Sequence, residues 1–164
     1  MTLAEGIKIE FANPYDAGSV AQLFFEDMTD LGVDPQLSDL EALARSVIDS
    51  THSATPDCLC IVARLEHGGA PVGVTLVNFN WSLKFAGRSL WIETLYVTPA
   101  ARRRSIGRFL AEYVLSYAYQ HGMSGIDLEA YQGNTPASIL YRSLGFHRLG
   151  RERFYYRIGE DEYL

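Results

Sequence analysis

Four arginines crowd the junction between a predicted strand and a predicted helix. Residues 97–115 read VTPAARRRSIGRFLAEYVL, with arginines at positions 102, 103, 104 and 108. A helix begins with unpaired backbone N–H groups and a partial positive charge, so acidic residues suit its first turn better than basic ones. A surface helix that merely begins with arginines is the alternative, but the electrostatic conflict favours a function. Small residues at Ser105 and Gly107 let a ligand approach, which predicts an anion site suited to a diphosphate.

The strand before these arginines stops at Pro99, because proline has no N–H to donate to a strand ladder. A strand that stops while its neighbour continues leaves backbone groups free. An extended ligand that carries amides could pair with them.

Hydrophobic periodicity predicts the elements that position this junction, in the order β-α-α-β-β-β-α-β-α-β. The order is that of one α/β domain over residues 1–164, with a mixed, largely antiparallel sheet flanked by helices. Ser38-x-x-Glu41 is predicted to be a capping box, Thr135 a helix cap and Gly145 a helix exit. The expected strands are 7–11, 57–65, 70–81, 90–97, 125–131 and 154–158, with a turn at 67–69 and a loop at 83–89; the expected helices are 16–31, one from Ser38, 106–120 and 135–144.

Charge is divided unevenly along the chain, whose net charge is -6. Residues 1–50 hold ten acids against Lys8 and Arg45, whereas residues 98–124 hold four arginines against Glu112. The split predicts two binding regions of opposite sign, although acids that only solvate helix surfaces explain the first half equally well. A nucleic-acid partner is not expected, because the basic patch is short and the chain is acidic.

Other residues indicate a metal-free cytoplasmic protein. Cys58 and Cys60 are too close for a normal disulfide and are expected to be core thiols. The histidines at 52, 67, 121 and 147 lack metal-site spacing, so no metal is predicted. No apolar run could span a bilayer and no secretion signal is evident, so we expect no membrane partner.

Two motifs resemble a known family. The stretch ETLYVTPAARRRSIGRFL, followed by NTPASILYRSLGF, resembles the GNAT superfamily of acetyl-CoA-dependent N-acetyltransferases. The family signature is V-x-P-x-x-[RQ]-x-x-G-x-[GA]-x-x-L, then N-x-x-A-x-x-[LF]-Y-x-x-x-G-F. The chain matches it at Val97, Pro99, Arg102, Gly107, Leu110, Asn134, Ala137, Leu140, Tyr141, Gly145 and Phe146.

The resemblance implies a site for acetyl-CoA. Backbone amides over 103–108 would cradle the pyrophosphate, and the main chain of Leu95 and Val97 would pair with the pantetheine arm. Asn134 would touch the pantetheine or the diphosphate, and Tyr141 would protonate the departing thiolate. The cofactor-binding set is expected to be Leu95, Tyr96, Val97, Arg102, Arg103, Arg104, Ser105, Ile106, Gly107, Arg108, Asn134, Ala137 and Tyr141.

Ser105 departs from the family pattern, which has glycine there. Serine keeps the backbone N–H and adds a hydroxyl, but it tolerates positive φ less well. We expect the pyrophosphate loop to survive, with Ser105 donating through its main chain, its side chain or both.

Two residues are candidates for proton transfer. Tyr141 suits a general acid, although its helical spacing with Ala137 and Leu144 fits plain packing as well. Glu93 is a lone carboxylate in an apolar strand and is the candidate base for the amine, acting directly or through water. Two residues separate it from Leu95, so alternation predicts that both side chains share a face. A Glu93 paired with an arginine, or simply facing the substrate, is the alternative.

The acceptor is expected to be a small primary amine. Residues 78–97 resemble the stretch of diamine and thialysine acetyltransferases that ends in LEDLYV, but Thr94 replaces the aspartate and removes one charge. An amino-acid-like amine is therefore favoured over a polyamine, with Glu26, Asp27 and Glu93 binding it. A protein N-terminus or lysine, and a non-catalytic acyl-CoA sensor, are the alternatives. Tyr155 and Tyr156 fit either a homodimer interface or the acceptor site.

Overall fold

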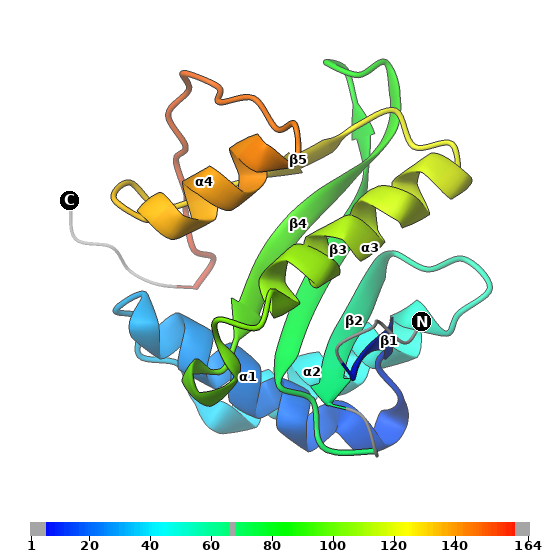
Figure 1. Cartoon of the computed structure of the whole chain (residues 1–164). Coiled ribbons are helices and arrows are strands. Elements are labelled where there is room, and N and C mark those ends of the chain that lie inside the picture. Colours follow the sequence, from blue (N-terminus) through cyan, green and yellow to red (C-terminus); the bar gives the residue numbers. More distant parts are fainter. Residues whose placement is uncertain (1–5, 66–67, 160–164) are drawn as a thin grey trace. The chain divides into compact units, whose positions relative to one another are not determined.

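The computed structural model describes residues 6–65 and 68–159. It falls into two compact units, residues 1–131 and 132–164, and the sheet lies in the first. The elements in chain order are β1 (Ile7–Phe11), η1 (Pro14–Asp16), α1 (Ala17–Asp30), α2 (Leu37–Thr51), β2 (Cys58–Leu65), β3 (Gly73–Ser82), β4 (Gly87–Val97), η2 (Pro99–Ala101), α3 (Ile106–Gln120), β5 (Ile126–Leu128) and α4 (Thr135–Ser143), where η marks a short 3-10 helix (Figure 1).

The five strands form one sheet in the order β1-β2-β3-β4-β5. Neighbours among β1 to β4 are antiparallel, whereas β5 runs parallel to β4 after the α3 crossover. The predicted mixed sheet, its hairpin and its strand–helix–strand crossover are therefore confirmed. β4 begins at Gly87, within the loop expected over 83–89, because hairpin pairing continues to the pair Ser82 and Gly87.

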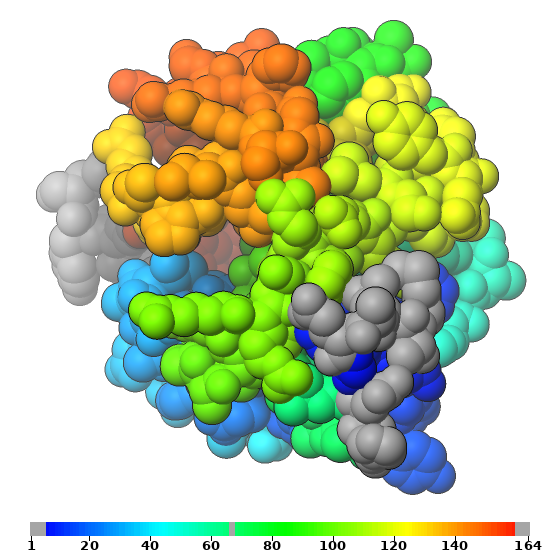
Figure 2. Space-filling model, viewed as in Figure 1, coloured from blue at the N-terminus to red at the C-terminus, as the bar shows by residue number. Residues whose placement is uncertain are grey.

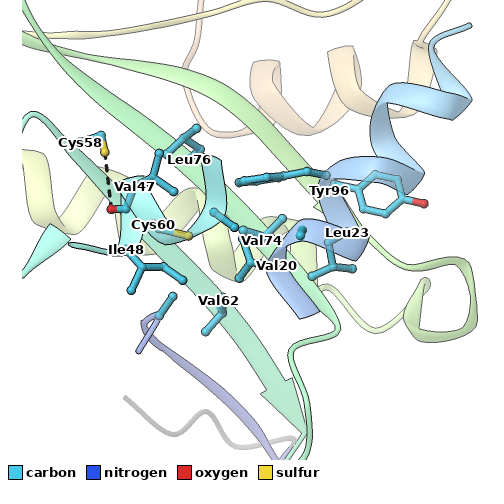
Figure 3. Close-up of a cluster of buried hydrophobic side chains, with 14 residues drawn as sticks. Val20, Leu23, Val47, Ile48, Cys58, Cys60, Val62, Val74, Leu76 and Tyr96 are labelled. Atoms are coloured by element: carbon cyan, nitrogen blue, oxygen red, sulfur yellow. Dashed lines mark hydrogen bonds between the residues drawn. The ribbon is translucent and has the colours of Figure 1, made fainter. Parts of the chain in front are cut away.

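Helices cover both faces of the sheet, with α1 and α2 on one and α3 on the other (Figure 1). Alternation along β2 sends Cys58, Cys60 and Val62 towards α1 and α2, while Leu59 and Ile61 face α3. Figure 3 shows both cysteines within the cluster of buried side chains that packs between the sheet and helices α1 and α2. Both thiols are buried and free, as expected, and burial raises the pKa of Cys60 to about 12.

Two predicted helix caps are wrong. Amides of Asp39 and Leu40 both donate to the carbonyl of Gln36, so α2 starts at Leu37 and Ser38 already lies inside its first turn. Ser38 therefore cannot act as the N-cap of a capping box. In α4, the cap is Asn134, whose side chain accepts from the Ala137 amide, and Thr135 is the first helical residue.

The strand expected over 154–158 is also absent from the described residues. Residues 151–157 have no regular secondary structure, and Tyr155 and Tyr156 are 84% and 73% exposed. Alternating apolar residues favour a strand only when a hydrogen-bonded neighbour is present, and no strand pairs with this segment. The strand predicted over 125–131 shortens to β5 for the same reason, because it pairs with only three residues of β4.

A buried ion pair anchors the start of α1 to the sheet. Asp16 and Arg64 are 5% and 7% exposed, and two guanidinium nitrogens donate to the two Asp16 oxygens at 2.8 and 2.6 Å. The Asn13 amide also donates to Asp16, and Arg64 Nε donates to Glu10. Burial alone would raise the pKa of Asp16, but the hydrogen bonds from Arg64 and Asn13 outweigh it and lower that pKa below its ordinary value of 3.8.

Asp16→Asn should lower the free energy of unfolding by about 3 kcal/mol at pH 7, because it leaves a buried guanidinium short of its partner. A carboxylate whose folded-state pKa is lowered stabilises the fold above its unfolded pKa, and that stability is lost as pH falls through the folded value. The deficit of the variant should therefore shrink below about pH 4. Urea unfolding at pH 7 and below about pH 4 measures the loss of stability in the variant. A loss that stays constant with pH would contradict the lowered pKa of Asp16.

Candidate active site

Glu93 is the extra residue of a β-bulge in β4. Across the β3–β4 ladder, Leu76 pairs with Thr94 and Val77 pairs with Ile92, so Glu93 has no partner. The bulge reverses the alternation of side chains along β4. Ile92 packs in the cluster under α3, whereas Tyr96 packs in the cluster under α1 and α2.

This bulge overturns the expectation that Glu93 and Leu95 share a face. Leu95 packs against the α3 cluster, while Glu93 is exposed and its Oε2 accepts a hydrogen bond from Trp91 Nε1 at 2.8 Å. Alternation fails here because it assumes an unbroken ladder. The carboxylate needs no charged partner, since the bulge opens it to solvent.

Within residues 6–65 and 68–159, no strand pairs with β4 beyond Ile92 on the side of β5, which leaves that part of β4 as a free edge. The three residues of β5 pair with Leu90 to Ile92 and no further. The Thr98 amide donates to Val72 at 2.9 Å on the β3 side, so the backbone groups of Val97 point to the opposite edge. The backbone of Leu95 points the same way by alternation, which leaves an extended edge that ends at Pro99.

The loop after Pro99 curls into the start of α3. Arg103 and Ser105 both adopt left-handed backbone conformations, with φ of 64° and 61°. Phe109 donates the first bond of the helix, to the Ser105 carbonyl, so the amides of residues 106–108 have no acceptor within it. No side chain caps this end and no acid lies in its first turn. The loop is part of the molecular surface drawn in yellow-green in Figure 2.

The four arginines divide into two kinds. Arg102 donates to the Val97 carbonyl, and Arg108 pairs with Glu112 at 3.6 Å. Arg103 and Arg104 are exposed, and neither meets an acidic or hydrogen-bonding partner among residues 6–65 and 68–159. Arg103 and Arg104 are thus the cations available to an anion at this helix end.

Acids of α1 meet hydroxyl groups of β4 and of Thr98, the residue after it. Thr94 donates to Asp27, and Thr98 lies 3.4 Å from Glu26. Burial raises the pKa of Asp27, a shift that the Thr94 hydrogen bond opposes and the charge of Asp30 reinforces. The second oxygen of Glu26 is buried and has no donor among the residues that the structure describes. It lies beside a cavity of about 300 Å³, which is lined by Gly18, Ser19, Gln22, Leu23, Glu26, Pro71 and Thr98.

Sequence reasoning missed this row of hydroxyls. Thr94, Tyr96 and Thr98 alternate, a spacing that indicates one shared face, but the face itself depends on the bulge. Burial, followed by the charges of Glu26 and Asp30, raises the pKa of Tyr96 to about 12. Tyr96 therefore acts as a hydrogen-bond donor under α1.

The remaining predicted site residues belong to the second unit and are described by themselves. α4 ends in a Schellman motif, in which the Phe146 amide donates to Tyr141 O and the Gly145 amide donates to Arg142 O. Gly145 has φ of 94°, which confirms it as the helix exit. The rings of Tyr141 and Phe146 meet edge to face at 5.8 Å, so the motif fixes the orientation of Tyr141. Ala137 is the residue whose amide Asn134 caps.

No three side chains of the metal-binding types come together in the ranges 6–65 and 68–159. None of the helices described is both long and apolar enough to cross a membrane.

Comparison with known sequences identifies relatives. The chain is 39% identical over 100 residues to the N-alpha-acetyltransferase RimI of Mycobacterium tuberculosis, a match that covers 58% of this chain and 61% of RimI. It is 28% identical over 146 residues to the bovine thialysine N-epsilon-acetyltransferase, covering 85% and 83% of the two chains. The match to an uncharacterized protein of Mycobacterium leprae spans only 20% of that protein's length.

Solved structures share the fold at low sequence identity. A possible acetyltransferase from Clostridium difficile superposes with a TM-score of 0.78 over 94% of this chain and 99% of that one, at 20% identity. AAC(6')-Iy in complex with the bisubstrate analog CoA-S-monomethyl-acetylneamine superposes with a TM-score of 0.74 over 92% and 97%, at 16% identity. The sequence model of the acetyltransferase (GNAT) family matches residues 20–146, and the chain therefore belongs to that family.

Proposed function

We propose that the protein is an acetyl-CoA-dependent N-acetyltransferase that acts on a small primary amine. The observation that carries the proposal is the start of α3, which no side chain caps and which follows the end of the free β4 edge along the chain. Three backbone amides and the helix dipole are found there, and Arg103 and Arg104 come just before them in the loop with no acidic or hydrogen-bonding partner among the described residues. A diphosphate matches all of these groups.

The β4 edge supports the rest of the cofactor. The pantetheine arm is extended and carries two amides, so it pairs with the backbone of Leu95 and Val97 as an added strand would. The thioester carbonyl then lies by Leu95. The diphosphate takes the amides of residues 106–108, with Arg103 and Arg104 as counter-charges.

The reaction proposed is direct acetyl transfer. The amine nitrogen attacks the thioester carbon, and the N–C bond forms as a tetrahedral oxyanion that a β4 N–H group stabilises. The C–S bond then breaks, and Tyr141 gives its phenolic proton to the thiolate. Glu93 takes the proton lost by the amine through a water molecule, a role that its exposure on the bulge supports.

The acceptor class rests on the relatives and on β4. The match to thialysine N-epsilon-acetyltransferase spans most of both chains and favours an amino-acid-like amine. The match to RimI favours a protein N-terminus as the second candidate. The Thr94 hydroxyl donates a hydrogen bond to Asp27. An amine near residue 94 would therefore meet the Asp27 carboxylate already engaged by a hydroxyl, and no second free carboxylate on β4.

An amine panel tests the function. CoA release from acetyl-CoA should be fastest with thialysine, lysine or short diamines, and at least about tenfold slower with peptides that present only an N-terminal amine. Turnover on the peptides alone would sink the small-amine proposal in favour of the RimI-like one. Binding of acetyl-CoA without turnover on any amine would indicate a sensor.

Replacing Arg103 and Arg104 together by alanine should weaken CoA binding about tenfold, or about 1.4 kcal/mol, because both charges next to the diphosphate are lost. Isothermal titration calorimetry measures the dissociation constant. Arg45→Ala, which removes an exposed arginine of α2, is the matched control. An unchanged dissociation constant in the double variant would place the diphosphate elsewhere.

Tyr141→Phe should lower kcat about 100-fold and leave the dissociation constant of acetyl-CoA within about twofold, because the ring and its contact with Phe146 remain while the acid is lost. Steady-state kinetics with the best amine, together with calorimetry, separates the two effects. Equal kcat in the variant would assign Tyr141 to packing.

A further inference from the structure

Asp30 occupies a position that is electrostatically unfavourable on its own helix. It is the last residue of α1, where the helix dipole favours a cation, and the last turn contains no basic residue. It also lies three residues after Asp27 on the same helix surface, and its charge contributes to the raised pKa of Asp27. Interactions outside α1 therefore decide where the Asp30 carboxylate is held.

Two groups from the β4 region converge on one oxygen of Asp30. The Tyr96 hydroxyl lies 3.4 Å from Oδ2, and Arg102 Nη2 lies 3.6 Å from the same atom. The Arg102 guanidinium carbon is 5.5 Å from the centroid of the Tyr96 ring. Figure 3 shows the Tyr96 hydroxyl directed away from the rest of the buried cluster.

The other side of the same guanidinium holds the end of β4. Arg102 Nε donates to the Val97 carbonyl at 3.0 Å. The planar fork of arginine can serve two acceptors at once, so Arg102 connects the end of α1 to the free strand edge. A carbonyl oxygen has two lone pairs, and Arg102 uses one of them.

We propose that Asp30 is a positioning residue for the cofactor: it holds Arg102 against Val97 and so fixes the carbonyl that the pantetheine arm pairs with. The inference rests on the proposed function, because that function places the pantetheine on this edge. Asp30 acts through Arg102 and touches neither the cofactor nor the amine.

A double-mutant cycle on CoA binding tests the inference. Asp30→Asn should raise the dissociation constant of CoA about fivefold. Arg102→Lys should do about the same, because the single ammonium nitrogen of lysine cannot take the places of both Nε, which donates to Val97, and Nη2, which faces Asp30. The double variant should be no weaker than the Arg102→Lys single variant. With acetyl-CoA as the varied substrate, KM should rise in the same ratio while kcat is unchanged.

Asp49→Asn is the matched control, since Asp49 is an exposed acid in the last turn of α2. Its dissociation constant should equal that of the wild type, and thermal unfolding should show all variants folded. Additive losses in the cycle, or normal CoA binding by Asp30→Asn, would overturn the inference while leaving the proposed function intact. A wild-type protein that binds no CoA would overturn both.

Discussion

The single inserted residue in β4 determines how the candidate site is arranged. Because Glu93 has no partner on β3, the alternation reverses at this point: Leu90 and Ile92 face α3, and two and four residues further on Thr94 and Tyr96 face α1. β5 stops pairing at Ile92, so the edge opens at the same point. The bulge therefore accounts for the exposed carboxylate and for the row of hydroxyls under α1, while the short β5 leaves the free backbone edge beside them.

Two ion pairs at the ends of α1 differ in burial and therefore in role: the buried pair stabilises the fold, and the exposed pair positions a side chain. Asp16 and Arg64 are almost completely buried, so breaking their bidentate pair leaves an uncompensated charge in the core. The Asp30 and Arg102 side chains are 57% and 49% exposed, and such pairs add little to stability. The second pair matters through where it places Arg102, at the boundary between the acidic helix and the cationic loop.

The sequence predicted the elements with strong periodicity and missed what depends on pairing. Residues 106–120 repeat at helical spacing and form α3 as expected, and the two family motifs indicated the loop and α4. The left-handed Ser105 shows why glycine is usual there: serine adopts φ of 61° at a cost of about 1 kcal/mol. The bulge at Glu93 and the missing strand at 154–158 were not predictable, because both depend on a partner strand's register rather than on local pattern.

A crystal structure of the protein with CoA tests the central claim most directly. The account predicts diphosphate oxygens within hydrogen-bonding distance of the amides of residues 106–108, and a pantetheine arm paired with the backbone of Leu95 and Val97. Arg103 and Arg104 should approach the diphosphate, while Arg102 stays on the Val97 carbonyl. A diphosphate bound away from the start of α3, with that helix end still open, would contradict the account.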